Sequence, residues 1–168
     1  MEQTRMNYLA WLRDAHAMEE QALMMMRGMV SRLENYPQLR MQIQKHIGET
    51  EEQLASLGRL LNRQGAGSSL VKDTMGRVTA LAQSMSGMFT GDEVVKGTLA
   101  SYTFENMEIA SYRILITAAE QLGDAEAIQV FTHCLHQEEA MAKWLADHAA
   151  EITRSFLSRA ELDLPSQR

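Results

Sequence analysis

Four glutamates of this sequence lie on helical faces that are otherwise apolar. Successive residues of an α-helix are about 100° apart, so residues three, four and seven positions apart share one face. By this period Glu19, Glu105 and Glu138 each lie in the middle of an apolar stripe. Glu108 lies beside Glu105 on the same face, whereas Glu139 points to one side of its stripe. Carboxylates are ligands for divalent metal ions, so this pattern indicates a metal site.

The apolar stripe of residues 39–61 adds an imidazole to these carboxylates. It carries His46 and Gln53, and Glu49 lies at its edge. Because His46 and Glu49 are three residues apart, they are neighbours on one helical face. His46 is therefore either a metal ligand or a histidine that hydrogen-bonds to a ligand. Oxygen-rich ligation with one imidazole suits iron or manganese better than metals that prefer thiolates.

The predicted turns place the carboxylates at one level along the bundle. In a helical hairpin, residues that are equally far from the turn lie opposite each other. Glu108 and Glu138 are equally far from Gly123, and by the same count from the first turn Glu19 lies within about one helical turn of Glu49. None of the stripes contains Lys or Arg that could balance these charges. Because an unpaired buried charge costs several kcal/mol, we expect two divalent cations in the middle of the bundle.

Tyrosines on the third stripe are candidates for contacts with these carboxylates. Tyr102 and Tyr112 both fall on the apolar face that carries Glu105. A buried tyrosine needs a partner for its hydroxyl group, and a ligating carboxylate can be that partner. We expect both tyrosines in the core.

Long helices must hold all of these residues. Helix-forming residues dominate, and the chain contains only 2 prolines. The turn and capping signals predict helices over residues 4–34, 37–64, 70–84 and 93–122, and a last one from residue 124. Two helical hairpins joined by a connection of roughly 25 residues predict an all-α, ferritin-like four-helix bundle whose long crossover carries a short extra helix. Residues 1–160 should form a single domain and residues 161–168 a frayed tail.

The acidic balance of the chain narrows the classes of partner. The formal net charge is −6, whereas a surface that binds nucleic acid needs clustered Lys and Arg, so we expect no nucleic-acid partner. The longest apolar run, residues 114–119, is too short to cross a membrane, and residues 1–5 lead into no signal-like apolar segment. We expect a cytoplasmic protein. The single cysteine, Cys134, has no partner for an internal disulfide or a thiolate zinc site.

Several short segments together resemble a known family. They are WLRDAHAME (11–19), SRLENYP (31–37), DEVVKG (92–97), FE followed by EIA (104–110), and MA followed by WL (141–145). Over most of the chain the sequence resembles the YciE and YciF family of ferritin-like bacterial stress-associated proteins, with the closer likeness to YciE. The resemblance implies a fold related to rubrerythrin, a homodimer instead of a storage cage, and a di-iron site with ferroxidase or peroxide-reducing activity.

The resemblance also implies a ligand set. Carried over by position, the bridging and terminal carboxylates are Glu19, Glu49, Glu105, Glu108 and Glu138. A full di-iron pattern has Glu-x-x-His on two helices, but Glu52 and Met141 stand where the histidines belong, and His46 instead precedes Glu49. The result is a more oxygen-rich site, which leaves manganese open as the native metal.

Two functions of different classes are compatible with the sequence. The first is an oxidoreductase that binds Fe(II) at the carboxylates and oxidises it with O2 or peroxide. The second is a non-enzymatic dimeric helical bundle that acts in the stress response through a protein partner. The chain has no rubredoxin-like cysteine pair for electron transfer, so the sequence supports metal binding more strongly than turnover.

Overall fold

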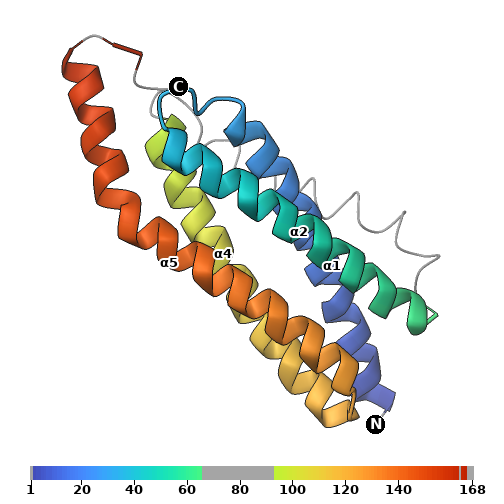
Figure 1. The fold of residues 1–168 in the computed structure, drawn as a ribbon. Helices are drawn as coiled ribbons and strands as arrows, with labels where there is room; N and C mark the ends of the chain where they lie inside the picture. The colour runs from blue at the N-terminus through green and yellow to red at the C-terminus, as the bar shows by residue number, and fades with distance from the viewer. Residues whose placement is uncertain (1, 66–92, 163, 166–168) are drawn as a thin grey trace.

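Long helices make up the described part of the chain, which in this computed structural model is residues 2–65, 93–162 and 164–165. They are α1 (Glu2–Val30), α2 (Pro37–Arg63), α4 (Glu93–Leu122) and α5 (Ala125–Glu161). α1 packs on α2 and α4, and α5 packs on α4 and α2, so each helix has two neighbours in a bundle (Figure 1). The described residues include no strand, which confirms the predicted all-α fold. No described helix is both long and apolar enough to cross a lipid bilayer.

The helix directions require one long crossover. Met29 near the end of α1 contacts Gly97 near the start of α4, whereas Tyr8 near the start of α1 packs in one cluster with Tyr112. α1 and α4 are therefore antiparallel. Because each helix of a tight hairpin is antiparallel to the other, α2 and α4 run in the same direction (Figure 1). The chain must return the length of the bundle between them, as in ferritin-like folds; the extra helix predicted at residues 70–84 lies outside the described residues.

Local capping explains three of the helix boundaries. α2 begins at Pro37, whose fixed φ suits a first helical turn. Gly123 has a φ of +67°, a left-handed conformation that ends α4 as predicted. The side chain of Asp124 then accepts a hydrogen bond from the backbone N–H of Ala127 (3.1 Å) and caps the start of α5.

The first helix ends earlier than predicted. α1 stops at Val30 instead of residue 34, and the backbone N–H of Arg32 bonds to the carbonyl of Met29 at 2.9 Å in a tighter turn. The predicted end rested on Pro37, because the residue before a proline avoids the helical conformation. The chain leaves the helix one turn earlier, and Leu33, the last residue of the predicted stripe, is buried outside any helix.

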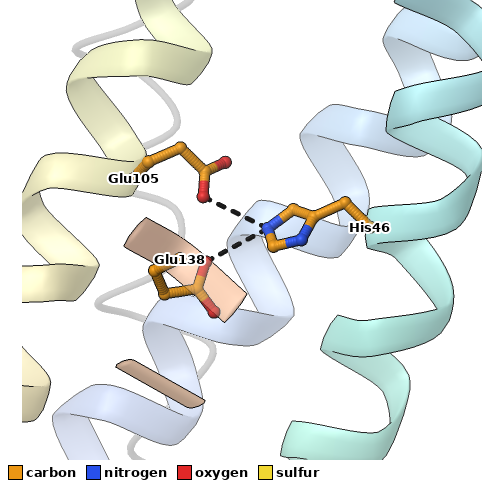
Figure 2. Close-up of side chains that lie close together, drawn as sticks. All are labelled: His46, Glu105 and Glu138. Atoms are coloured by element: carbon orange, nitrogen blue, oxygen red, sulfur yellow. Dashed lines mark ion pairs between the residues drawn. The ribbon is translucent and has the colours of Figure 1, made fainter. Parts of the chain in front are cut away.

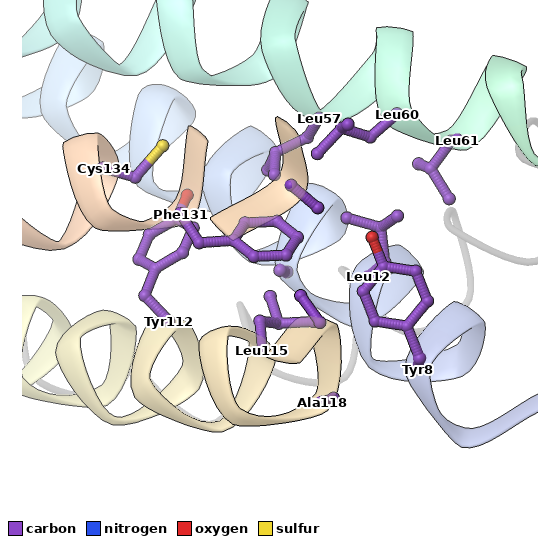
Figure 3. Packing of buried hydrophobic residues seen from close by; sticks show 13 residues of the cluster. Tyr8, Leu12, Leu57, Leu60, Leu61, Tyr112, Leu115, Ala118, Phe131 and Cys134 are labelled. Carbon is purple, nitrogen blue, oxygen red and sulfur yellow. The ribbon is translucent and has the colours of Figure 1, made fainter. Parts of the chain in front are cut away.

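Two apolar clusters fill the bundle, one toward each end. The Phe131 cluster (Figure 3) consists of Tyr8, Leu12, Ala15, Leu57, Leu60, Leu61, Tyr112, Leu115, Ala118, Ala119, Ala127, Phe131 and Cys134. The Ile43 cluster consists of Met18, Ala22, Met26, Leu33, Tyr36, Leu39, Ile43, Val94, Phe104, Met141, Leu145 and Ile152. Along each helix, a buried ionisable residue lies where one cluster gives way to the other. The core is therefore divided by a polar layer, which consists of Glu19, His46, Glu105, Glu108 and Glu138.

The inward face of α4 differs at one position from the predicted stripe. Tyr102 is 40 % exposed, so the prediction that it lies in the core is wrong. Its neighbour Ser101 and the following Phe104 are buried instead, because the face turns by about 100° per residue and passes to one side of Tyr102. Tyr112 is fully buried, as predicted.

Candidate metal centre

The polar layer in the middle of the bundle is built mainly from glutamates. Glu19, Glu108 and Glu138 have 0 % of their surface exposed, and Glu105 has 3 %. The helical period therefore assigned these side chains to the correct face, and each comes from a helix that continues unbroken through the layer. α2 contributes His46, which is 1 % exposed. Every helix of the bundle thus supplies at least one ionisable group.

Three side chains of the layer converge on one point. His46 Nε2 lies 3.1 Å from Oε2 of Glu105 and 3.1 Å from Oε2 of Glu138 (Figure 2). One atom from each residue lies within 4.8 Å of the other two. Neither of these two contacts has the geometry of a hydrogen bond. Ligands about 2.1 Å from one metal ion and about 90° apart are about 3 Å from one another, so the spacing is that of adjacent metal ligands.

Glu19 and Glu108 extend the layer beyond these three residues. Both carboxylate oxygens of Glu108, and Oε2 of Glu19, are buried without a hydrogen-bond donor. Oε1 of Glu19 accepts a hydrogen bond from the hydroxyl of Tyr112. None of the buried residues in the described ranges is Lys or Arg. The layer thus combines an excess of carboxylate oxygens with a shortage of positive charge.

The electrostatics of the layer follow from this shortage. Burial, and then the charge of Glu138, raise the pKa of Glu19 well above its usual range. Burial likewise raises the pKa of Glu108, with the neighbouring carboxylates adding to the effect. Burial raises the pKa of Glu105 to about 8, although contact with the ring of His46 opposes the rise. Without a cation, such carboxyls favour the protonated form near neutral pH.

His46 carries a positive charge within the layer. Burial alone lowers its pKa, but contacts with Glu105, Glu138 and Glu49 outweigh burial and raise the pKa to about 12. Nδ1 of the ring lies 3.0 Å from Oε2 of Glu49. Contact with the ring is the main reason that the pKa of Glu49 falls to about 2, and Lys45, whose Nζ is 2.7 Å from Oε1 of Glu49, lowers it further.

The structure places the predicted site residues in two groups. Glu19, His46, Glu105, Glu108 and Glu138 belong to the buried layer. Glu49 contacts the far ring nitrogen of His46, away from the point where Nε2 meets the carboxylates. Glu49 therefore fixes the orientation of the imidazole.

Sequence reasoning missed one contact of the layer. The side-chain amide of Gln53 donates hydrogen bonds to Oε1 of Glu138 and, at 2.9 Å, to Oε1 of Gln137. The available signal was the position of Gln53 on the apolar stripe, seven residues after His46. A buried amide there needs a polar partner on a facing helix.

The bundle consists of two helical hairpins, and a long crossover joins the parallel helices α2 and α4, one from each hairpin. Buried carboxylates and one imidazole lie across its middle. This arrangement is that of a ferritin-like helical protein. The chain belongs to the family described as Domain of unknown function (DUF892), whose model matches residues 3–158.

Solved structures of similar chains support this assignment. A protein from Xanthomonas campestris pv. campestris is 39 % identical, with a TM-score of 0.79 over 94 % of this chain and 99 % of that one. The Escherichia coli stress protein YciF is 21 % identical, with a TM-score of 0.76 over 89 % and 96 %. YcfI from Rhodopseudomonas palustris is 23 % identical, with a TM-score of 0.68 over 85 % and 92 %. The predicted YciF-like family is confirmed, and the closer likeness to YciE stays a prediction.

Proposed function

We propose that the polar layer binds two divalent metal ions, iron in the first place and manganese as the alternative. The convergence of His46 Nε2, Glu105 and Glu138 is the observation that carries the proposal. Glu108, which has no donor for either oxygen, supports it. Because a buried carboxylate without a partner costs several kcal/mol, bound cations would offset a penalty that the apolar clusters cannot.

Each side chain of the layer has a role in this proposal. His46, Glu105 and Glu138 would hold one ion, and Glu19 and Glu108 would supply oxygens for the other. Outer residues orient these ligands: Glu49 contacts His46 Nδ1, Gln53 donates to Glu138, and Tyr112 donates to Glu19. A metal-ligating histidine commonly has a carboxylate at its second ring nitrogen, and ligating carboxylates are themselves hydrogen-bonded. The donor set therefore fits a metal centre in its surroundings as well as in its ligands.

For the reaction we propose oxidation of Fe(II) to Fe(III) by O2 or peroxide. Reduction of hydrogen peroxide to water takes two electrons and two protons, which a pair of Fe(II) ions and the solvent can supply. The carboxylates neutralise the higher charge of the ferric product, and the apolar clusters on both sides keep bulk water out of the layer. YciF of Escherichia coli is a stress protein, and we propose a role in the stress response for this chain as well.

Metal binding is tested by titration of chelator-treated protein with Fe(II) under anaerobic conditions, and with Mn(II) in parallel. We expect about two ions per chain. Glu138→Ala should abolish the tighter site, whereas Glu139→Ala should bind like wild type, because Glu139 is on the surface and pairs with Arg113 at 2.7 Å. Equal behaviour of the two variants would show that the buried glutamate is not a ligand.

Turnover is tested separately by stopped-flow absorbance after Fe(II)-loaded protein meets peroxide or O2. Glu19→Ala and Glu105→Ala should both slow the oxidation. Because a bundle that forms no cage has no cavity for mineral, we expect about one oxidation per site unless a reductant is added. Equal rates in wild type and both variants would mean that iron is oxidised in free solution.

The alternative function, a non-enzymatic dimeric interaction protein, is favoured by one surface feature. Trp11 and Ile114 are 41 % and 52 % exposed and line a pocket of about 570 Å³ between α1 and α4. We propose a homodimer that covers this face, which light scattering of Trp11→Glu would test by a shift to monomer. A cytoplasmic location and the absence of nucleic-acid and membrane partners stay predictions.

A further inference from the structure

A second pocket opens on the seam between α2 and α5, beside the polar layer. Its volume is about 290 Å³, and its lining includes Glu52, Gln53, Ser56, Gln129, His133 and Gln137. Gln53 belongs to this lining and also donates a hydrogen bond to Oε1 of Glu138, which is 0 % exposed. The side chain of Gln53 therefore connects the solvent-accessible pocket with the buried carboxylates.

The size and charge of this pocket suit a hydrated cation. Six water molecules occupy about 180 Å³ at about 30 Å³ each, so a hydrated divalent ion fits the space. The lining offers the carboxylate of Glu52 and the amide oxygens of Gln129 and Gln137, and it contains no Lys or Arg. Carboxylate and amide oxygens replace the water ligands of hard divalent ions readily.

The edge of α2 beside His46 is less favourable for a cation. The side chain of Glu49 is 20 % exposed there, whereas His46 is 1 % exposed. Lys45 lies 2.7 Å from Glu49, so its ammonium group offsets the charge of the only carboxylate that contacts the outer ring nitrogen of His46 among the described residues. The pocket between α2 and α5, whose Glu52 has no Lys or Arg beside it in the lining, is the more favourable of these two approaches.

We propose that this seam pocket is the port through which divalent cations reach the polar layer, with the side chain of Gln53 as its inner gate. The inference rests on the proposed metal binding and adds a route to it. To pass, an ion requires Gln53 to release its hydrogen bonds to Glu138 and Gln137 and to turn aside. A gate changes the rates of entry and exit by the same factor and leaves the equilibrium affinity unchanged, whereas a ligand changes the affinity itself.

The port is tested with Co(II), whose visible absorbance reports its coordination. The full-length, chelator-treated protein is mixed with Co(II) in a stopped-flow instrument, and bound Co(II) is then extracted with excess EDTA. Gln129→Trp narrows the mouth of the pocket at an exposed residue. Gln44→Trp is the matched control, because Gln44 is also an exposed glutamine but lines neither this pocket nor the pocket between α1 and α4.

We expect Gln129→Trp to slow both loading and extraction by about fivefold or more, with an unchanged amount bound at equilibrium. Gln44→Trp should behave like wild type. Gln53→Ala provides a second variant that opens the gate, so it should accelerate loading; because Gln53 also supports Glu138, only the loading rate of this variant tests the gate. Circular dichroism of each variant confirms that it is folded.

The outcomes separate this inference from the function on which it rests. If wild type binds no Co(II), Fe(II) or Mn(II) at equilibrium, the metal site and the port are both refuted. If wild type binds metal but Gln129→Trp and Gln53→Ala load at the rate of Gln44→Trp, the metal site stands and the port is refuted. A change of affinity in Gln53→Ala without a faster loading rate would likewise refute the gate and make Gln53 only a support for Glu138.

Discussion

Replacing Glu108 by glutamine should stabilise the metal-free protein near neutral pH. Glu108 is fully buried, has no donor for either oxygen, and is surrounded by other carboxylates, so its pKa lies well above the usual range. The unfolded chain ionises freely above a pKa of about 4.3, and folding at about pH 7.5 must therefore return a proton to this group. Glutamine has a similar shape and needs no proton.

The magnitude follows from the difference between pH and the unfolded pKa. At about pH 7.5 the pH lies about 3.2 units above the pKa of a glutamate in the unfolded chain. Protonating Glu108 on folding therefore costs at most about 4 kcal/mol, at about 1.36 kcal/mol for each unit. The amide of glutamine lacks partners at the same place, which costs about 2 kcal/mol. The net gain for Glu108→Gln is about 2 kcal/mol, which raises the thermal midpoint of a chain of this length by about 4–8 °C.

The sign of the effect depends on pH. A carboxyl with a raised folded-state pKa contributes its full stability below the unfolded pKa and loses that contribution as pH rises toward the folded pKa. At about pH 5 the proton costs only about 1 kcal/mol, so the advantage of glutamine should vanish or reverse there. With metal bound, wild type should be more stable than the variant at both pH values, because the ions need the carboxylate that the variant lacks.

Thermal unfolding followed by far-ultraviolet circular dichroism measures this difference in EDTA-treated protein. Glu120→Gln is the matched control, since Glu120 is an exposed glutamate on the same helix. Its midpoint should stay close to that of wild type at both pH values. If Glu108→Gln destabilises the metal-free protein equally at both pH values, Glu108 is not an unpartnered buried carboxyl and the argument for the metal centre loses its main energetic support.

Further predictions concern the layer and its neighbours. The thermal midpoint of metal-free wild type should fall from about pH 5.5 to about pH 8, because the pKa of Glu105 is raised to about 8 and that of His46 to about 12, so the folded chain keeps protons that the unfolded chain releases and its stability falls as pH rises. Metal saturation should flatten or reverse this trend. Tyr112→Phe removes the donor to Glu19 and should lower the free energy of unfolding of the metal-loaded protein by about 1–3 kcal/mol in urea titrations, and no loss would mean that the ligand needs no support. Cys134 is buried and has a pKa raised to about 12 by that burial, so it should react with a thiol reagent only after unfolding; rapid reaction in the native state would contradict the packing of the Phe131 cluster.

The helical period was sufficient to identify the buried face of each helix. Glu19, Glu105, Glu108 and Glu138 were all assigned correctly, because a side chain's direction in a helix is fixed by its place along the chain. The turn chemistry was also local: Gly123 needs a positive φ that glycine adopts at no steric cost. Fold class followed from these features together with the length of the connection between the hairpins.

Contacts between helices could not be obtained in this way. Whether Glu49 faces the carboxylates or the far nitrogen of His46 depends on a side-chain rotamer that the interhelical spacing selects. The hydrogen bond from Gln53 to Glu138 depends on how far α2 is shifted along α5, and the packing of side chains between the two helices sets this shift to within a fraction of a turn. Tyr102 was misplaced for a related reason, since a residue at the margin of a stripe turns inward or outward according to the partner helix.

The division of the core by a polar layer has a consequence for the way substitutions combine. The Phe131 and Ile43 clusters share no residue, and free-energy changes add when the altered sites are more than about 7–10 Å apart and have no common partner. Leu57→Ala and Ile43→Val should therefore be additive, whereas substitutions of Tyr8 and Phe131, whose ring centroids are 6.3 Å apart, should not be. In evolutionary terms, each end of the bundle can accumulate its own compensating substitutions. Substitutions at one end do not restrict those at the other as long as the residues of the polar layer are kept.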